Sequence, residues 1–167
     1  MARALLVGCG CHGREAAGML IERGWAVRGT SRRADGLEAI ASAGVEAALA
    51  DPDRVGTIVE LLGDVTVVCW LLGSVEGGSE VARTLHVERL PSLLEKLVDT
   101  PVRGYVHEAA GSADGGALEA GGAAVVDAAE RWRIPVEWVR TSRETGEAWA
   151  ERVANACSAV IGGGPTG

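Results

Sequence analysis

Three glycines near the amino terminus have the spacing of a turn that binds phosphate. Gly8, Gly10 and Gly13 follow the apolar residues 4–7 and lead into residues 14–23, whose apolar positions recur at helical spacing. At this spacing the first glycine permits a tight turn, the second lets the backbone approach a diphosphate, and the third lets the helix pack closely. The amino terminus of the helix then offers free N–H groups to the phosphates. The turn predicts a dinucleotide site with these residues: Gly8, Gly10, Cys11, His12 and Gly13. The alternative is a turn that only connects the strand to the helix.

The residues after the second expected strand, 25–30, bear on which dinucleotide is bound. A site for NAD places an acidic residue there, which accepts a hydrogen bond from the ribose 2′-hydroxyl. This chain instead has Thr30, Ser31, Arg32 and Arg33, and its next carboxylate is Asp35. Two guanidinium groups and two hydroxyls match the charge and hydrogen-bonding capacity of a 2′-phosphate. The sequence therefore predicts NADP(H), with NAD(H) as the alternative cofactor; solvated surface arginines are the competing interpretation.

The ends of the third and fourth expected strands, 45–50 and 65–72, supply further candidates. Ligands of parallel sheets lie at the carboxyl ends of strands. Asp51 is therefore placed to accept a hydrogen bond from an adenine amino group, or else it caps a helix that begins at Pro52. Leu71, Leu72 and Gly73 are expected to line the adenosine and ribose side of the same crevice.

Catalytic and metal-binding chemistry has less support. His107 follows the fifth expected strand, 102–106, where it would lie beside the nicotinamide and act as a general acid or base near neutral pH. The alternative is a histidine that is hydrogen-bonded at a strand end. Cys9, Cys11 and His12 are close together, but a metal there would compete with the phosphate-binding N–H groups and no second ligand cluster follows. We therefore predict no metal site.

Six strand-like runs alternate with helical segments, which is typical of a parallel sheet covered on both faces. The most apolar run, 65–72, predicts a central strand. The expected strands are 4–7, 25–30, 45–50, 65–72, 102–106 and 135–139, and the expected helices are 14–23, 36–43, 52–63, 77–98 with a bend or break at Pro91, 123–132 and 144–160. The pattern predicts a three-layer, doubly wound α/β Rossmann fold. One domain is expected over residues 1–161, with a disordered tail over 162–167.

Composition excludes several classes of function. The chain has 167 residues, of which 47% are hydrophobic, and its formal charge of −7 opposes binding to nucleic acid. No apolar run is long enough to cross a membrane, so we expect a cytoplasmic protein. The four cysteines are too few and too unevenly spaced for a disulfide framework. An apolar face on the last two helices is compatible with a homodimer.

Three segments together resemble a known family. Residues 6–13 (LVGCGCHG), residues 23–32 (RGWAVRGTSR) and residues 64–73 are similar to the atypical short-chain dehydrogenase/reductases, the NAD(P)-binding relatives of nucleotide-sugar epimerases. The resemblance covers roughly the first 75 residues. It implies the strand order 3-2-1-4-5-6 and NADP-type binding at the glycine turn and Arg32.

The chain departs from this family in its catalytic motif. Catalytic members have Tyr-x-x-x-Lys after the fifth strand, where the lysine lowers the pKa of the tyrosine that takes the substrate proton. Here the only tyrosine, Tyr105, lies inside the expected fifth strand and Ala109 stands four residues later. The chain also ends before the extension that forms the substrate pocket of larger members, which suggests a truncated or non-catalytic member.

The sequence leaves the function open between three classes. One is an NADP-dependent oxidoreductase that reduces a small carbonyl or imine substrate, which the sequence does not identify. Another is a non-catalytic dinucleotide-binding sensor, or a subunit that works with a partner protein. A third is a Rossmann-like domain for another ligand, such as coenzyme A or a nucleoside.

Overall fold

The computed structural model describes residues 1–162 and contains one sheet of six parallel strands. The strands lie in the order β3-β2-β1-β4-β5-β6, which confirms the predicted fold class. Their bounds are β1 (Arg3–Val7), β2 (Ala26–Ser31), β3 (Glu46–Leu49), β4 (Val67–Trp70), β5 (Gly104–Glu108) and β6 (Val136–Val139). Each lies within about two residues of its expected range, because strand ends depend on pairing that the sequence pattern does not contain.

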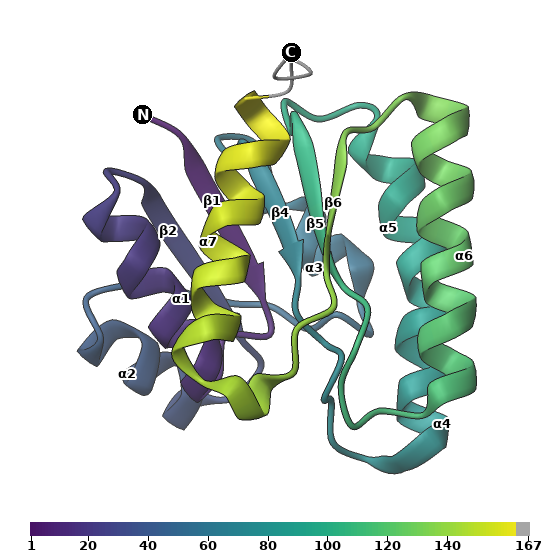
Figure 1. Ribbon diagram of the computed structural model, residues 1–167, viewed down its shortest axis with the longest axis horizontal. Coiled ribbons are helices and arrows are strands. Elements are labelled where there is room, and N and C mark those ends of the chain that lie inside the picture. The colour runs from purple at the N-terminus through teal and green to yellow at the C-terminus, as the bar shows by residue number, and fades with distance from the viewer. Residues whose placement is uncertain (163–167) are drawn as a thin grey trace.

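Helices cover both faces of the sheet (Figure 1). One layer contains α1 (Cys11–Glu22), α2 (Ala34–Ser42) and α7 (Glu147–Gly162), with α1 and α7 side by side. The other contains α3 (Val55–Val59), α4 (Gly78–Arg83), the π-helical segment η1 (Thr84–Arg89), α5 (Leu90–Leu97) and α6 (Gly115–Trp132). A short 3₁₀ turn, η2 (Arg143–Thr145), joins β6 to α7. The three layers of a doubly wound fold are thus complete.

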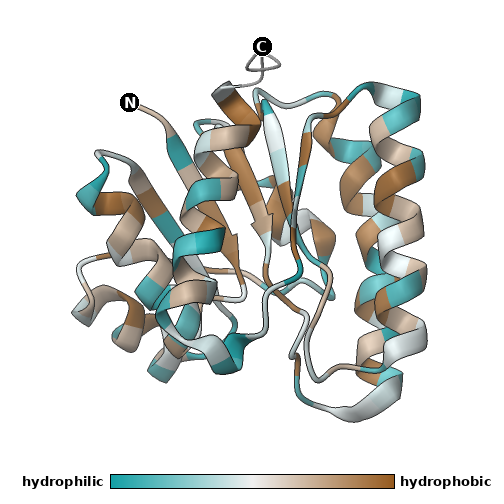
Figure 2. Ribbon diagram, viewed as in Figure 1, coloured by the Kyte–Doolittle hydropathy of each residue, from teal (hydrophilic) through white to brown (hydrophobic). Residues whose placement is uncertain are grey.

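The core lies on both faces of the central strands. All four residues of β4 are buried, as predicted for a central strand, and Figure 2 shows the hydrophobic colour concentrated on the strands and the inner faces of the helices. Trp149 is fully buried between α7 and the sheet, whereas Trp70 and Tyr105 are fully buried in the opposite layer. Large side chains thus fill the space between the sheet and the helices on both faces.

The register brings the carboxyl ends of the central strands together. Val7 pairs with Trp70, and Trp70 pairs with His107, so β1, β4 and β5 end side by side. The start of β1 and the end of α7 lie at the opposite end of the sheet in Figure 1. The first described residues and the end of α7 are therefore remote from the strand ends that hold the candidate site.

The largest error of the sequence prediction concerns α6. The helix was expected over 123–132, after the glycine-rich residues 111–122, but it begins at Gly115. Asp114 caps it by accepting a hydrogen bond from the Ala117 N–H at 2.9 Å. A Cβ on Gly121 would lie 3.2 Å from the Cβ of His86, so this glycine lets α6 pack closely against η1. Tertiary packing thus overrides the low helix propensity of glycine.

The region 77–98 is interrupted at the place where Pro91 predicts a bend. Its π-helical segment ends at Arg89, immediately before α5, in which Pro91 is one of the first residues. Proline has no N–H to donate and its ring clashes with the carbonyl four residues earlier, here that of Val87. The wider turns of η1 accommodate this clash.

Two smaller predictions also need correction. The helix expected over 52–63 is limited to α3, and α7 extends through Gly162, which was expected to be the first residue of the tail. The other residues of that expected tail, 163–167, lie outside the described residues. No helix among residues 1–162 is both long enough and apolar enough to span a bilayer.

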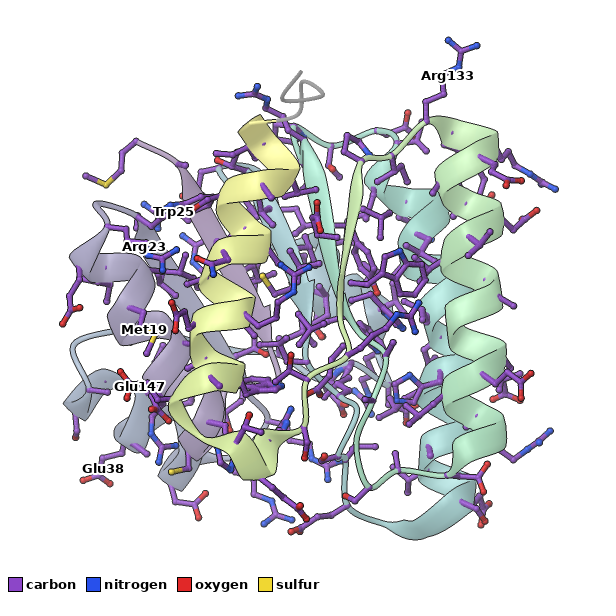
Figure 3. The ribbon with its side chains drawn as sticks, in the orientation of Figure 1. Met19, Arg23, Trp25, Glu38, Arg133 and Glu147 are labelled. Carbon is purple, nitrogen blue, oxygen red and sulfur yellow. The ribbon has the colours of Figure 1, made fainter. Side chains whose placement is uncertain are left out.

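The apolar face of α7, which suggested a homodimer, is largely buried within the chain against α1 and the sheet. Figure 3 shows Met19 and Arg23 in the region between α1 and α7, and Arg23 donates a hydrogen bond to Asn155 Oδ1 at 2.8 Å. By contrast, Arg133 at the end of α6 projects away from the body of the molecule.

Candidate functional site

A cavity of about 490 Å³ lies at the carboxyl ends of β1, β2, β3 and β4. Its walls come from the glycine turn, the ends of these strands, Arg14 of α1, Gly36 of α2, α4, η1 and the single residue Arg143 beyond β6. The predicted site residues that line it are Gly8, Gly10, Thr30, Ser31, Arg32, Asp51, Leu71 and Leu72. The predicted residues that do not line it are Cys11, His12, Gly13, Arg33, Gly73 and His107. The sequence therefore predicted some of the residues that line the cavity but not all of them.

The three glycines of the turn have three different surroundings. Gly8 has a φ of +94°, and a Cβ there would collide with the carbonyl oxygen of Leu71. Gly10 lines the cavity and has no atom within 4 Å of the position that a Cβ would occupy. At Gly13 a Cβ would lie 2.9 Å from the carbonyl oxygen of Gly8. Only Gly10 therefore leaves open space through which a ligand can approach the backbone at the start of α1.

Cys9, between these glycines, has a packing role. A Cβ on Gly29 of β2 would lie 2.6 Å from the Cys9 Sγ, so the thiol fills the space above that glycine. Burial raises the pKa of the Cys9 thiol to about 11, although Arg14 opposes this rise, so the group remains protonated at neutral pH. Cys11 is exposed. Within residues 1–162 the structure groups no three His, Cys, Asp or Glu side chains that could hold a metal ion.

The end of β2 separates the two arginines that the sequence had paired. Arg32 is exposed and lines the cavity, whereas Arg33 precedes α2 as its N-cap residue and does not line it. The Ser31 hydroxyl accepts a hydrogen bond from the Arg33 N–H at 3.1 Å. The Thr30 hydroxyl donates to the Leu6 carbonyl at 3.4 Å. Arg32 is thus the cavity-lining guanidinium at this strand end, and both hydroxyls have partners within the protein.

Asp51 lines the cavity but does not cap a helix, which corrects the alternative drawn from the sequence. Its Oδ1 accepts a hydrogen bond from the Asp53 N–H at 2.9 Å, which closes a local turn before α3 begins at Val55. The Thr57 hydroxyl accepts a hydrogen bond from the Asp51 N–H at 2.9 Å. These bonds fix the loop at the end of β3 and leave Asp51 Oδ2 without a hydrogen-bond partner among the described residues.

The segment after β4 forms the floor of the cavity. Leu71 and Leu72 are almost fully buried side chains that line it. The Leu72 carbonyl lies 2.9 Å from Nε2 of the buried His86, which donates to it. Burial lowers the pKa of His86, so the ring is neutral and accepts from Trp70 through Nδ1. Gly73 lies outside the cavity, and a Cβ there would collide with the Ala110 carbonyl oxygen.

His107 is buried in the layer of α5 and α6 and does not reach the cavity. Its Nδ1 is hydrogen-bonded to the Tyr105 hydroxyl at 2.8 Å, and its ring packs against Trp138. Nε2 has no hydrogen-bond partner among the described residues. Burial lowers the pKa of His107 to about 3, with contributions from His86 and Arg140. A neutral histidine enclosed in this way is not placed to exchange a proton with a ligand in the cavity.

Sequence reasoning missed the best-connected polar group of the site, a buried cluster of Glu108, Arg143 and Trp149. Arg143 donates from Nε and Nη2 to both carboxylate oxygens of Glu108, each at 2.8 Å. The same carboxylate accepts from the Gly73 N–H at 2.7 Å and from the Trp149 indole at 2.8 Å. The sequence contains a signal for Glu108, namely a carboxylate at the end of a strand whose other residues are buried. Arg143 lies in an irregular turn, where spacing gives no signal.

Comparisons with known proteins agree with this fold. No protein-family model matches the sequence, and no curated protein matches it either. Among solved structures, a short-chain dehydrogenase/reductase superfamily protein from Agrobacterium tumefaciens with bound NAD is similar, with a TM-score of 0.67 and 19% identity over 83% of this chain and 48% of that one. Yeast methylglyoxal/isovaleraldehyde reductase complexed with NADPH has a TM-score of 0.65 and 13% identity over 84% of this chain and 56% of that one.

A third similar structure is UDP-N-acetylglucosamine 4-epimerase from Bacillus cereus. Its TM-score is 0.64 and its identity 11%, over 84% of this chain and 58% of that one. The chain thus spans about half the length of these three proteins. At this level of identity the likeness shows the fold, and it confirms at that level the resemblance that the sequence motifs indicated.

Proposed function

We propose that this protein binds a nicotinamide dinucleotide in the cavity, with the diphosphate at the glycine turn and the adenosine half between β2 and β4. The observation that supports this most strongly is the open space above Gly10. A diphosphate can approach the backbone there, while Gly8 and Gly13 are closed by close packing. The first N–H groups of a helix of 12 residues then face the anion.

NADP(H) is the proposed cofactor in preference to NAD(H). Arg32 lines the cavity at the end of β2, where a ribose 2′-phosphate would lie. Arg14, in the first turn of α1, lines the same cavity and adds a second guanidinium that the sequence did not indicate. Asp35 does not line it, so no carboxylate from residues 26–36 faces the ribose. The yeast reductase that holds NADPH and the Agrobacterium protein that holds NAD have the same fold, which supports this class of ligand.

An oxidoreductase is one activity compatible with this ligand, since a bound nicotinamide donates or accepts hydride. The cavity walls favour the second candidate, a dinucleotide-binding sensor or a subunit that needs a partner for catalysis. No tyrosine, lysine or histidine is among the described residues that line the cavity. Tyr105 is fully buried, and burial raises its pKa well above 10, so it remains a neutral phenol.

Titration calorimetry with NADPH and NADH tests the proposal. We expect NADPH to bind at least tenfold more tightly than NADH, which is about 1.4 kcal/mol. Arg32→Ala should remove most of this difference, because it deletes the charge-assisted hydrogen bonds to the 2′-phosphate. Arg33→Ala is the matched control, since Arg33 is the exposed neighbour that does not line the cavity.

Each outcome has a defined meaning. Equal binding of NADPH and NADH by the wild-type protein would overturn the assignment of Arg32 to the 2′-phosphate and leave a dinucleotide site. No binding of either cofactor at millimolar concentration would overturn the proposed function itself.

A further inference from the structure

Of the residues that line the cavity, Arg143 is the furthest in sequence from the glycine turn. It nevertheless contacts the segment beside that turn. Its Nη2 donates a hydrogen bond to the Leu71 carbonyl at 2.8 Å. That same carbonyl oxygen is the atom against which Gly8 packs. Leu71 therefore joins the Arg143 guanidinium to the start of the glycine turn, although the residues are far apart in sequence.

The guanidinium is held in one orientation by buried partners. Glu108 is fully buried and accepts from Arg143 through both oxygens. The guanidinium also lies 4.8 Å above the ring of Trp149. Because the side chain is already ordered, binding a ligand costs little of the rotamer entropy that an arginine ordinarily loses. Glu108 balances the charge, so Arg143 acts as a directed donor more than as a free cation.

One donor group of this arginine remains available. Nε and Nη2 have protein partners, whereas Nη1 makes no hydrogen bond to any described residue. The side chain is 20% exposed and Arg143 lines the cavity. An arginine fixed by a buried carboxylate and left with one free donor edge is arranged to bind an anion.

We propose that Arg143 binds the diphosphate of the nucleotide from the side opposite the start of α1. This inference rests on the proposed function, and it extends the phosphate site from the glycine turn to the segment between β6 and α7. The ligand class is a nucleoside diphosphate or a dinucleotide that contains one. Asp53, an acidic residue of the cavity wall, is paired with Arg89 at 2.8 Å, which reduces its repulsion of such an anion.

Calorimetry with ADP and adenosine isolates the diphosphate. We expect Arg143→Ala to weaken ADP binding by about tenfold or more and to leave adenosine binding unchanged, because one charge-assisted hydrogen bond is lost. Arg140→Ala is the matched control. Arg140 lies three residues earlier, stacks on Trp138 and does not line the cavity, so neither ligand should be affected.

Equal losses for ADP and adenosine, or no loss for either, would overturn the role of Arg143. If the wild-type protein binds neither ligand nor NADPH, the proposed function fails instead. Because Arg143→Ala leaves the Glu108 carboxylate buried without its cation, the variant could fail to fold. The wild-type protein then provides the test through the Nε–Hε resonance of Arg143 in nuclear magnetic resonance spectra, with Arg143→Lys used for its assignment. This resonance should shift with ADP and not with adenosine, and an unchanged resonance at saturating ADP would overturn the proposal.

Discussion

His107 and Glu108 are neighbours on β5 and point into opposite layers of the molecule. Glu108 receives four hydrogen bonds, from Gly73, Trp149 and two nitrogens of Arg143, so its charge is compensated although it is fully buried. His107 has one hydrogen bond and remains neutral. A buried charge is tolerated only when it is paired, whereas a buried histidine loses its proton instead. Of the two, Glu108 is the residue connected to the cavity.

The neutral state of His107 predicts a specific acid sensitivity. Its pKa is about 3 in the folded protein and 6.5 ordinarily, so below pH 6.5 the unfolded chain binds a proton that the folded chain does not. The free energy of unfolding should therefore fall as the pH decreases from 6.5 toward 3, by about 1.4 kcal/mol per pH unit for this group. His86, whose pKa is also lowered, adds to the slope.

Urea denaturation between pH 7 and pH 4.5 measures this slope, in a range where most carboxylates stay ionised. His107→Gln cannot titrate, so its slope should be smaller than that of the wild-type protein even if the variant is less stable at pH 7. Identical slopes would show that His107 has the same protonation state in the folded and unfolded chains, which would contradict a lowered pKa in the folded protein.

At the residue scale, the sequence predicted those parts of the site that belong to local motifs. The glycine spacing and the arginine at the end of β2 can be recognised because strand, turn and helix follow one another in the chain. Arg33 was paired with Arg32 because sequence adjacency does not reveal which side chain faces the cavity. Arg143 could not be predicted, since its partners Glu108 and Leu71 are 35 and 72 residues away.

At the element scale, α6 and η1 show how glycine can stabilise contact between helices. Gly121 of α6 faces His86 of η1, and His86 in turn supports the Leu72 carbonyl on the floor of the cavity. The close approach of the two helices thus sets the position of a residue in the candidate site. Its neighbour Gly122 has more room, with the nearest atom of Trp138 at 3.8 Å from the position of a Cβ.

Substitution of these two glycines should have different effects on stability. Gly121→Val places branched methyl groups against His86, and overpacking of this kind costs about 1–3 kcal/mol. Gly122→Val should cost less than about 1 kcal/mol, because the added atoms make ordinary contacts and the entropy of glycine in the unfolded chain is reduced. Midpoints of urea denaturation measure both changes. Equal destabilisation by the two variants would show that the contact of α6 with η1 is not tight.

The elements were predicted best where hydrophobic periodicity dominates. All six strands lie near their expected ranges, because strand-like and helical patterns alternate along the chain. Their order also agrees with the structure, but it was implied by the family resemblance and not by these patterns. The start of α6 was missed because its first turns are rich in glycine, which has a low helix propensity; of these glycines, Gly121 packs closely against η1. The π-helical segment before Pro91 was expected only as a bend, since sequence does not specify how the backbone absorbs the missing hydrogen bond.

At the scale of the whole molecule, the fold directs four strand ends into one cavity and keeps the described chain ends away from it (Figure 1). A ligand that binds only the folded state stabilises the entire molecule through this cavity. The gain is about 2.7 kcal/mol when the free ligand is at a hundred times its dissociation constant. Binding can therefore be read as an increase in the melting temperature, without knowledge of any reaction.

Gly10 provides the most direct test of the proposed site. Apart from its chain neighbours, no atom lies within 4 Å of the position of a Cβ on Gly10, so Gly10→Val should fold, although valine at this N-cap position of α1 should lower the melting temperature slightly in the absence of ligand. The added side chain nevertheless occupies the space through which a diphosphate would reach the backbone. Gly18→Val is the matched control, because Gly18 has the same free space but lies further along α1, outside the cavity.

The decisive measurement is the melting temperature of these three proteins with and without NADPH. NADPH should raise the melting temperatures of the wild-type and Gly18→Val proteins by several degrees, and it should leave that of Gly10→Val unchanged. An equal increase in all three proteins would contradict a diphosphate site at the glycine turn, and the absence of any increase in the wild-type protein would contradict dinucleotide binding.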